Sequence, residues 1–485
     1  MAPVLHHLGA AELARRIARG EVSSCTLLEI FLERIERFNP QLNAVVLLRA
    51  EAARERAGQA DRALRAGIRW GPLHGVPITI KECFDWTGTP STFGRPERRE
   101  HRASEDAEAV ARLIRAGAIV LGKTNVPLDL ADWQTFNAVY GATLNPWDHE
   151  RSPGGSSGGA AVALAAGLSA LELGSDSGGS IRMPSHFCGV YGHKPSFGIV
   201  PVRGHSASPG LPPDDINVAG PLARSAEDLE LALRLIAGAE GPRSRAWHLD
   251  LPEPDRSSLR DYRVAVITGD AEFPVDSDTR RTALDVAQIL KSEGAAVSLD
   301  PALPIPSRDY YELHIALARA ATSFRRSPAD VAALAPAAAA LDPADRGYEA
   351  LMLRGLTQSH REWLERHAER QRLRDRWEVF FRTYDVLIAP VSPTPAFPHM
   401  HEVPKPQQQL IVDGKARPNA DTYFWIGLAA MAYLPATTIP AGQSAAGLPI
   451  GLQIIGPDYA DLRCIALARQ LESAHRGFLP PPAYA

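Results

Sequence analysis

The sequence is poor in cysteine, and its four cysteines lie far apart. Cys25, Cys83, Cys188 and Cys464 form no CxxC pair. Structural zinc sites are typically built from CxxC pairs, and disulfide frameworks are typical of short chains rich in cysteine, so neither is expected to organise this fold. We expect buried free thiols in a reducing compartment, which makes the cytoplasm the expected location.

Long apolar segments and a strong excess of one charge are also missing. No run approaches 18 apolar residues and the N-terminus has no signal-peptide core, so we expect no membrane span or membrane partner. The 52 lysines and arginines against 56 acidic residues leave a net charge of −4, without a basic block. This balance argues against nucleic acid as a partner, while a homodimer stays open.

Short apolar runs alternate with helical patterns along much of the chain. Residues 76–80 predict a strand that ends directly on Lys81, with the proline at its start. Residues 117–121 and 263–268 predict two more strands, and a helical pattern follows near 279–293. The alternation predicts an α/β architecture with a largely buried sheet.

Two other regions are predominantly helical in pattern. Residues 8–38 predict two amphipathic helices, the second capped by Ser24. Residues 311–380 are rich in alanine, arginine and glutamate and lie between proline-rich segments. We expect this second region to be a helical insertion that covers a pocket.

Two segments match known motifs literally but lack the local structure that each motif requires. Residues 117–124 (GAIVLGKT) fit the P-loop pattern, but the four residues between the glycines favour a strand over a phosphate-binding loop. Residues 154–158 (GGSSG) fit the GxSxG nucleophile elbow, but the preceding stretch is polar and contains prolines, whereas an elbow follows a hydrophobic strand. A nucleotide-binding enzyme and an elbow hydrolase are therefore both disfavoured.

A second glycine-serine run, at residues 174–180 (GSDSGGS), places flexible backbone next to serine hydroxyls. Backbone N–H groups aimed at one point beside a nucleophile are what an acyl-transfer oxyanion needs. A plain turn is the alternative. Serine also needs a base, and Lys81 is a candidate because burial at the end of an apolar strand favours a neutral amine. A solvated surface lysine is the alternative there.

Lys81, the GGSSGG run at 154–159 and the GSDSGGSIR run at 174–182 together resemble the amidase signature family. The resemblance covers about residues 8–475 and is weakest across 240–390. Further motifs in the family's order are KTN at 123–125, YGAT at 140–143, NPW at 145–147, CG at 188–189, KP at 194–195, GP at 220–221, RS at 224–225, LPA at 434–436, PAG at 440–442 and GLPIGLQIIGP at 447–457.

The resemblance implies an amidase-signature fold of the α/β class, with a central mixed β-sheet surrounded by helices. It implies one domain over residues 1–485. The catalytic core would comprise 8–240 and 390–475, with the variable helical region 311–380 near the substrate pocket.

The resemblance also assigns roles to individual residues. Ser180 matches the nucleophile, Ser156 the bridging serine that follows a cis peptide bond, and Lys81 the base. No metal and no organic cofactor is required. The oxyanion hole and the residues supporting it match, respectively, the backbone N–H groups of Ser177, Gly178, Gly179 and Ser180, and the side chains of Ser157, Asp176 and Arg182.

Substrate choice is expected to come from variable apolar residues. Trp133, Phe136, Trp425 and Ile426 are candidates to line the pocket, although ordinary core packing is the alternative for each. Such a pocket would suit aryl or alkyl amides, and the same acyl chemistry serves carbamates (urethanes) and esters. The family also contains the A subunit of tRNA-dependent amidotransferase. Residues 203–217 do not resemble the corresponding stretch of that protein, which favours a free-standing hydrolase.

Overall fold

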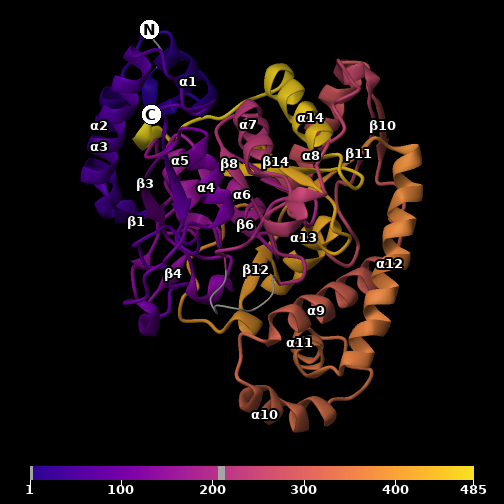
Figure 1. The fold of residues 1–485 in the computed structure, drawn as a ribbon. Helices are drawn as coiled ribbons and strands as arrows, with labels where there is room; N and C mark the ends of the chain where they lie inside the picture. The colour runs from indigo at the N-terminus through magenta and orange to yellow at the C-terminus, as the bar shows by residue number, and fades with distance from the viewer. Residues whose placement is uncertain (1–3, 206–213) are drawn as a thin grey trace.

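A mixed sheet of eleven strands runs through the middle of the protein (Figure 1). The computed structural model describes residues 4–205 and 214–485. Within them, the strands lie in the order β1 (Val45–Leu48), β3 (Ile119–Thr124), β2 (Pro77–Lys81), β6 (Glu172–Asp176), β8 (Val218–Ala223), β7 (Tyr191–Lys194), β14 (Ala436–Gln443), β15 (Pro449–Ile455), β11 (Val386–Pro390), β9 (Arg263–Val266) and β10 (Ala296–Leu299). Parallel and antiparallel neighbours both occur, which confirms the expected fold class.

Helices surround this sheet. Fourteen α-helices occur in the described residues. Several of them bury apolar side chains in a first hydrophobic core, which includes Leu13, Phe31 and Leu164. The fourteen helices are α1 (Ala10–Ala18), α2 (Ser24–Leu42), α3 (Ala50–Arg65), α4 (Glu108–Arg115), α5 (Gly158–Ala165), α6 (Arg182–Cys188), α7 (Ala226–Ile236), α8 (Ser277–Ser292), α9 (Ser307–Ser323), α10 (Pro328–Ala339), α11 (Tyr348–Thr357), α12 (His360–Thr383), α13 (Thr422–Ala430) and α14 (Asp461–Ala474).

The two ends of the chain meet on one side of the molecule (Figure 1). Tyr484, next to the C-terminus, packs its ring against Phe38 of α2 with centroids 5.1 Å apart. Arg34 of the same helix donates a hydrogen bond to the Tyr484 carbonyl at 2.7 Å. The C-terminal segment therefore closes over the N-terminal helices.

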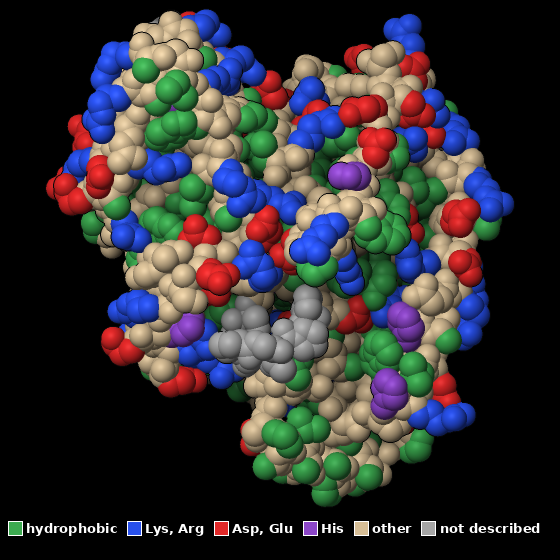
Figure 2. Space-filling model, in the orientation of Figure 1, with side chains coloured by type: hydrophobic (Ala, Val, Ile, Leu, Met, Phe, Trp, Pro, Cys, Tyr) green, Lys and Arg blue, Asp and Glu red, His purple; other side chains and the backbone are tan. Residues whose placement is uncertain are grey.

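The helices α9 to α12 form a separate group, drawn in orange (Figure 1). They account for the helical pattern expected over 311–380, although α9 begins earlier, at Ser307. α9 packs against α11 and α13. These contacts join the group to a second hydrophobic core, which includes Tyr310, Leu351 and Phe424. On the face shown in Figure 2, lysines and arginines are interspersed with acidic side chains. No helix in the described part of the chain is long and apolar enough to cross a membrane.

The local predictions differ from the structure in small ways. α2 is capped by Ser23, whose side chain accepts a hydrogen bond from Thr26, so the expected cap at Ser24 is displaced by one residue. β3 extends to Thr124, and the GKT part of the apparent P-loop is therefore strand as well. The stretch at 203–217 lies partly outside the described residues.

Candidate functional site

Lys81 is the last residue of β2, where burial and strand order place it beside the second glycine-serine run. β2 and β6 are parallel neighbours, so their carboxyl ends share one edge of the sheet. The Lys81 Nζ donates to the Oγ of Ser156 at 2.7 Å and to the Oγ of Ser175 at 3.0 Å. Complete burial lowers the pKa of Lys81 to about 8, because desolvation disfavours the charged amine.

Ser156 is held in a crowded turn that leads into α5. The Gly155–Ser156 peptide bond is cis. A Cβ atom on Gly155 would lie 2.4 Å from the carbonyl oxygen of Asp132, so only glycine fits at that position. No strand leads into this turn, because residues 152–154 are irregular, and the GGSSG segment is therefore not a nucleophile elbow.

The second loop carries the predicted nucleophile and oxyanion hole. Gly179 has a φ of 88°, a conformation that favours glycine, and a Cβ there would lie 2.8 Å from Ile426. Among the described residues, the backbone N–H groups of Ser177, Gly178 and Ser180 have no hydrogen-bond partner. The Gly179 N–H, by contrast, donates to Asp176 at 2.9 Å. Of the four predicted oxyanion-hole donors, three therefore have no partner in the described part of the chain, whereas Gly179 is engaged by Asp176.

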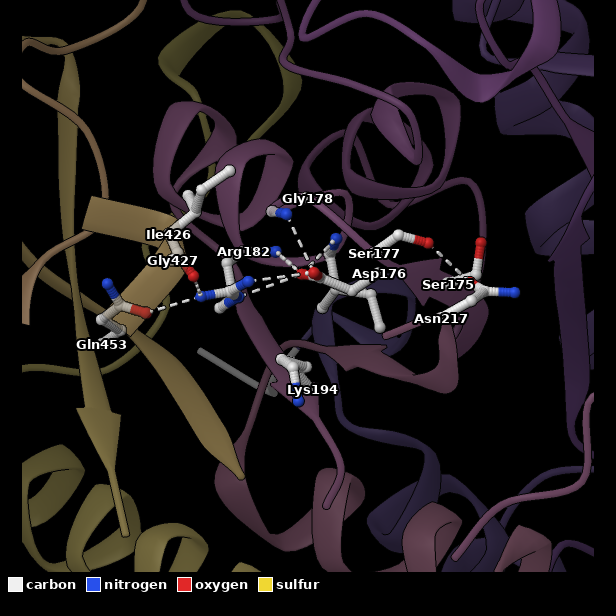
Figure 3. A network of polar contacts seen from close by, with 12 residues as sticks. Ser175, Asp176, Ser177, Gly178, Arg182, Lys194, Asn217, Ile426, Gly427 and Gln453 are labelled. Atoms are coloured by element: carbon white, nitrogen blue, oxygen red, sulfur yellow. Dashed lines mark hydrogen bonds and ion pairs between the residues drawn. The ribbon is translucent and has the colours of Figure 1, made fainter. Parts of the chain in front are cut away.

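Asp176 and Arg182 form the buried polar centre beneath this loop (Figure 3). The carboxylate accepts from the Arg182 side chain at 3.0 and 3.1 Å and from the Ile181 backbone at 3.1 Å. Burial alone would raise the pKa of Asp176, but the Arg182 charge brings it down to about 2. Arg182 also donates to the Ile426 carbonyl and to Gln453, at 2.8 and 2.9 Å.

We expect Arg182→Met to damage folding and activity together. The substitution leaves the Asp176 carboxylate buried without its cation, a change that typically costs about 3–5 kcal/mol. Urea unfolding monitored by tryptophan fluorescence should show that loss, with a parallel fall in turnover. The exposed Arg361→Met, on α12, should change neither. An Arg182→Met protein with unchanged stability would contradict this assignment of the ion pair.

A cavity of about 360 Å³ opens beside these residues. Both predicted serines reach it: the Ser180 side chain is only slightly exposed and Ser156 is buried. Ser177 also lines it, and its hydroxyl donates to the Asn217 side chain at 2.9 Å. Ser157 lies deeper, where its N–H donates to the Ser180 carbonyl at 3.1 Å. The helices α9 and α11 supply further residues that line this cavity.

Only one of the four expected pocket residues is among the described residues that line this cavity. Trp133 lines it and donates its indole N–H to the Gly178 carbonyl at 2.8 Å. Trp425 is instead fully buried in the second core, and Ile426 packs under the oxyanion loop. Phe136 stacks on His401 with ring centroids 4.1 Å apart. Phe136, Trp425 and Ile426 are therefore not among the described residues that line this cavity.

Several residues at the site carried no recognisable sequence signal. Ser175 lies between Lys81 and His205, whose Nε2 is 2.8 Å from the Ser175 Oγ. The Asn217 amide donates to the other ring nitrogen of His205 at 3.3 Å. Burial lowers the pKa of His205 to about 3, so this chain of contacts reaches Lys81 through a neutral imidazole. Ser175 could have been suspected from its place before Asp176, but His205 lies 30 residues from Ser175 in an irregular segment.

The comparisons with known proteins agree with this arrangement. The family model described as Amidase matches residues 26–465. The chain is 33% identical to the A subunit of glutamyl-tRNA(Gln) amidotransferase from Halorhodospira halophila, over 96% of this chain and 97% of that one. It is also 33% identical to "Putative amidase AmiB2" of Mycobacterium bovis, over 96% of each chain. A solved bacterial aryl acylamidase of the amidase signature family superposes with a TM-score of 0.81 at 26% identity, covering 97% of each chain.

These matches define the class of protein as an amide-hydrolysing enzyme. The chain belongs to the amidase signature family, and the resemblance noted in its sequence is confirmed.

Proposed function

We propose that this chain is a free-standing amidase that hydrolyses linear amides through Ser180, Ser156 and Lys81. The observation that carries the proposal is the position of Lys81. Its amine is fully buried, lies 2.7 Å from the Ser156 hydroxyl, and has no carboxylate within ion-pair distance among the described residues. A desolvated lysine of this kind can act as a general base near neutral pH.

The proposed reaction has two steps. Neutral Lys81 takes the hydroxyl proton of Ser156, which takes the hydroxyl proton of Ser180 as the Ser180 oxygen attacks the amide carbon. The tetrahedral intermediate collapses, the C–N bond breaks, and the proton returns through Ser156 to the leaving amine. Water then attacks the acyl-enzyme ester by the same proton route and releases the acid and Ser180.

The N–H groups of Ser177, Gly178 and Ser180 would stabilise the tetrahedral oxyanion. Asp176 and Arg182 hold these donors in place from below, which fixes them before the substrate arrives. Donors that are already oriented need no reorganisation during the reaction. Asp176 and Arg182 therefore act as positioning residues for the loop.

The same acyl chemistry extends to carbamates and esters, so the substrate class needs a direct test. We expect the purified protein to hydrolyse at least one compound in a panel of anilides, aliphatic amides, carbamates and p-nitrophenyl esters. A fluorophosphonate probe should label Ser180, identified by peptide mass spectrometry. Labelling at Ser156, or a protein that is unreactive and inactive toward every compound, would refute the proposal.

A second candidate is the A subunit of an amidotransferase, because curated relatives of that name match nearly the full chain. Such a protein would be expected to require its partner subunits. Hydrolysis of several simple amides by the isolated chain would favour the free-standing enzyme. Amide hydrolysis that appears only in the presence of amidotransferase partner subunits would favour the second candidate.

A further inference from the structure

Arg319, a cation that lines the cavity, has no carboxylate partner among the described residues. Arg319 lies on α9 and lines the cavity, where its side chain is partly buried. Its guanidinium donates to the hydroxyl of Tyr348 at 2.8 Å and to the hydroxyl of Tyr423. Its Nε is buried and has no hydrogen-bond partner in the described part of the chain. An arginine is always charged at physiological pH, so this site holds a positive charge with unused donor capacity.

A second cation lies at the same corner. The Lys405 Nζ lies 4.5 Å from the ring centroid of Trp133 and 5.7 Å from that of Tyr423. It donates to the Ala131 carbonyl at 2.8 Å, and it forms no ion pair with any described carboxylate. Arg319 and Lys405 thus flank one aromatic pair from two different segments of the chain.

The acidic residues of the cavity are mostly engaged elsewhere. Arg95, Arg325 and Arg370 form ion pairs with, respectively, Asp129, Asp214 and Asp215. Asp132 is the exception, but it is partly exposed and accepts from the backbone N–H of Gln134. No carboxylate of the described residues therefore neutralises Arg319 or Lys405.

The pKa of Tyr423 reflects the positive electrostatic potential at this corner of the cavity. Its burial would raise the phenol pKa, yet the charges of Arg319 and Lys405 lower that pKa to about 8. A phenol shifted in this direction is stabilised as an anion by its surroundings. The same surroundings would stabilise a carboxylate that entered the cavity.

This cationic corner adjoins the reacting residues. A Cβ on Gly178 would lie 3.8 Å from the Tyr423 ring, and Trp133 donates to the Gly178 carbonyl. Arg319, Lys405, Trp133 and Ser180 all line one cavity. A group bound at the corner would therefore belong to a molecule whose amide could reach Ser180.

We propose that Arg319 and Lys405 form an anion subsite, and that the substrate is an amide whose acyl or amine half carries a carboxylate. This inference rests on the proposed amidase function and narrows its substrate class. The carboxylate would accept from the Arg319 guanidinium and from the Lys405 ammonium, which fixes the amide relative to the oxyanion-hole donors. The expected apolar aryl or alkyl pocket becomes a pocket with one charged end.

The test compares matched charged and neutral amides. One arm uses succinyl, glutaryl and adipoyl p-nitroanilides, each against its terminal carboxamide. The other uses 4-acetamidobenzoate against 4-acetamidobenzamide, which places the carboxylate on the amine half. We expect kcat/KM to favour the carboxylate by about 10- to 100-fold in one arm, the effect typical of a charged hydrogen bond. That arm identifies the half of the substrate that binds the corner.

Substitutions of the two cations test whether the subsite causes the preference for carboxylates. Arg319→Met and Lys405→Met should each reduce the carboxylate-to-carboxamide ratio toward 1, whereas Arg319→Lys should keep part of it. Arg361→Met removes the same charge from an exposed site on α12 and should keep the full ratio. A wild-type enzyme that hydrolyses amides without favouring carboxylates, or a ratio that survives both methionine variants, would overturn the subsite.

A binding measurement separates this inference from the amidase proposal. Glutarate, which has no amide to hydrolyse, is titrated by calorimetry into the unmodified protein and into the Arg319→Met and Lys405→Met proteins. Binding that depends on both cations supports the subsite even if no amide is hydrolysed, in which case only the proposed function fails. If amide hydrolysis proceeds but glutarate binds all three proteins equally, the subsite fails and the amidase stands.

Discussion

Replacing Ser180 with alanine should reduce amide hydrolysis by at least about 10⁴-fold. The substitution removes the oxygen that forms the acyl-enzyme, and loss of a catalytic nucleophile has effects of this size or larger. The fold should persist, because the side chain is small and lies at the cavity wall. Initial rates with the best substrate of the panel measure the loss, and circular dichroism checks the fold.

The matched control is Ser185→Ala, five residues along the same segment. Ser185 is fully buried, and its hydroxyl donates to the Ile181 carbonyl within α6 rather than to the cavity. This variant loses one buried hydrogen bond, worth about 1 kcal/mol of stability, and should keep its turnover. Equal rates for Ser180→Ala and wild type would rule out Ser180 as nucleophile.

Much of the fold could be predicted because its signals are local. Apolar runs located β2, β3 and β9 to within a few residues, and the helical periodicity located α1, α2 and α8. The order of the strands in the sheet could not be predicted from such local signals. It places β14 and β15 between β7 and β11, and such long-range pairing is not encoded in any short window of sequence.

The candidate site also has one part that could be predicted from the sequence and one part that could not. Lys81, Ser156 and Ser180 stand in recognisable segments, so their roles could be proposed from the sequence. The pocket could not, because a buried aromatic residue looks the same in a sequence whether it faces a core or a cavity. Trp425 faces the core, whereas Arg319 faces the cavity from a helix that showed only a generic pattern.

Lys81 and Lys123 are two buried lysines whose contacts can be compared directly. Both are buried at the ends of adjacent parallel strands, and burial lowers the pKa of each to about 8. Of the two, Lys81 alone contacts Ser156. The Lys123 Nζ donates instead to the Pro90 carbonyl at 2.6 Å and to the Ser91 hydroxyl at 3.1 Å. A shifted pKa is therefore not sufficient for catalysis, and position decides between the two.

Lys81→Met should lower kcat/KM by about 10²- to 10⁴-fold, the range typical for loss of a general base. In the wild type, kcat/KM should rise about tenfold per pH unit below pH 7 and level off above about pH 9, since the base must be neutral and its pKa is about 8. Lys81→Met should lose this inflection. The Lys123→Met protein should retain the inflection whatever its stability, because Lys123 does not contact Ser156. A profile for Lys81→Met that still rises through pH 8 would assign the base to another group.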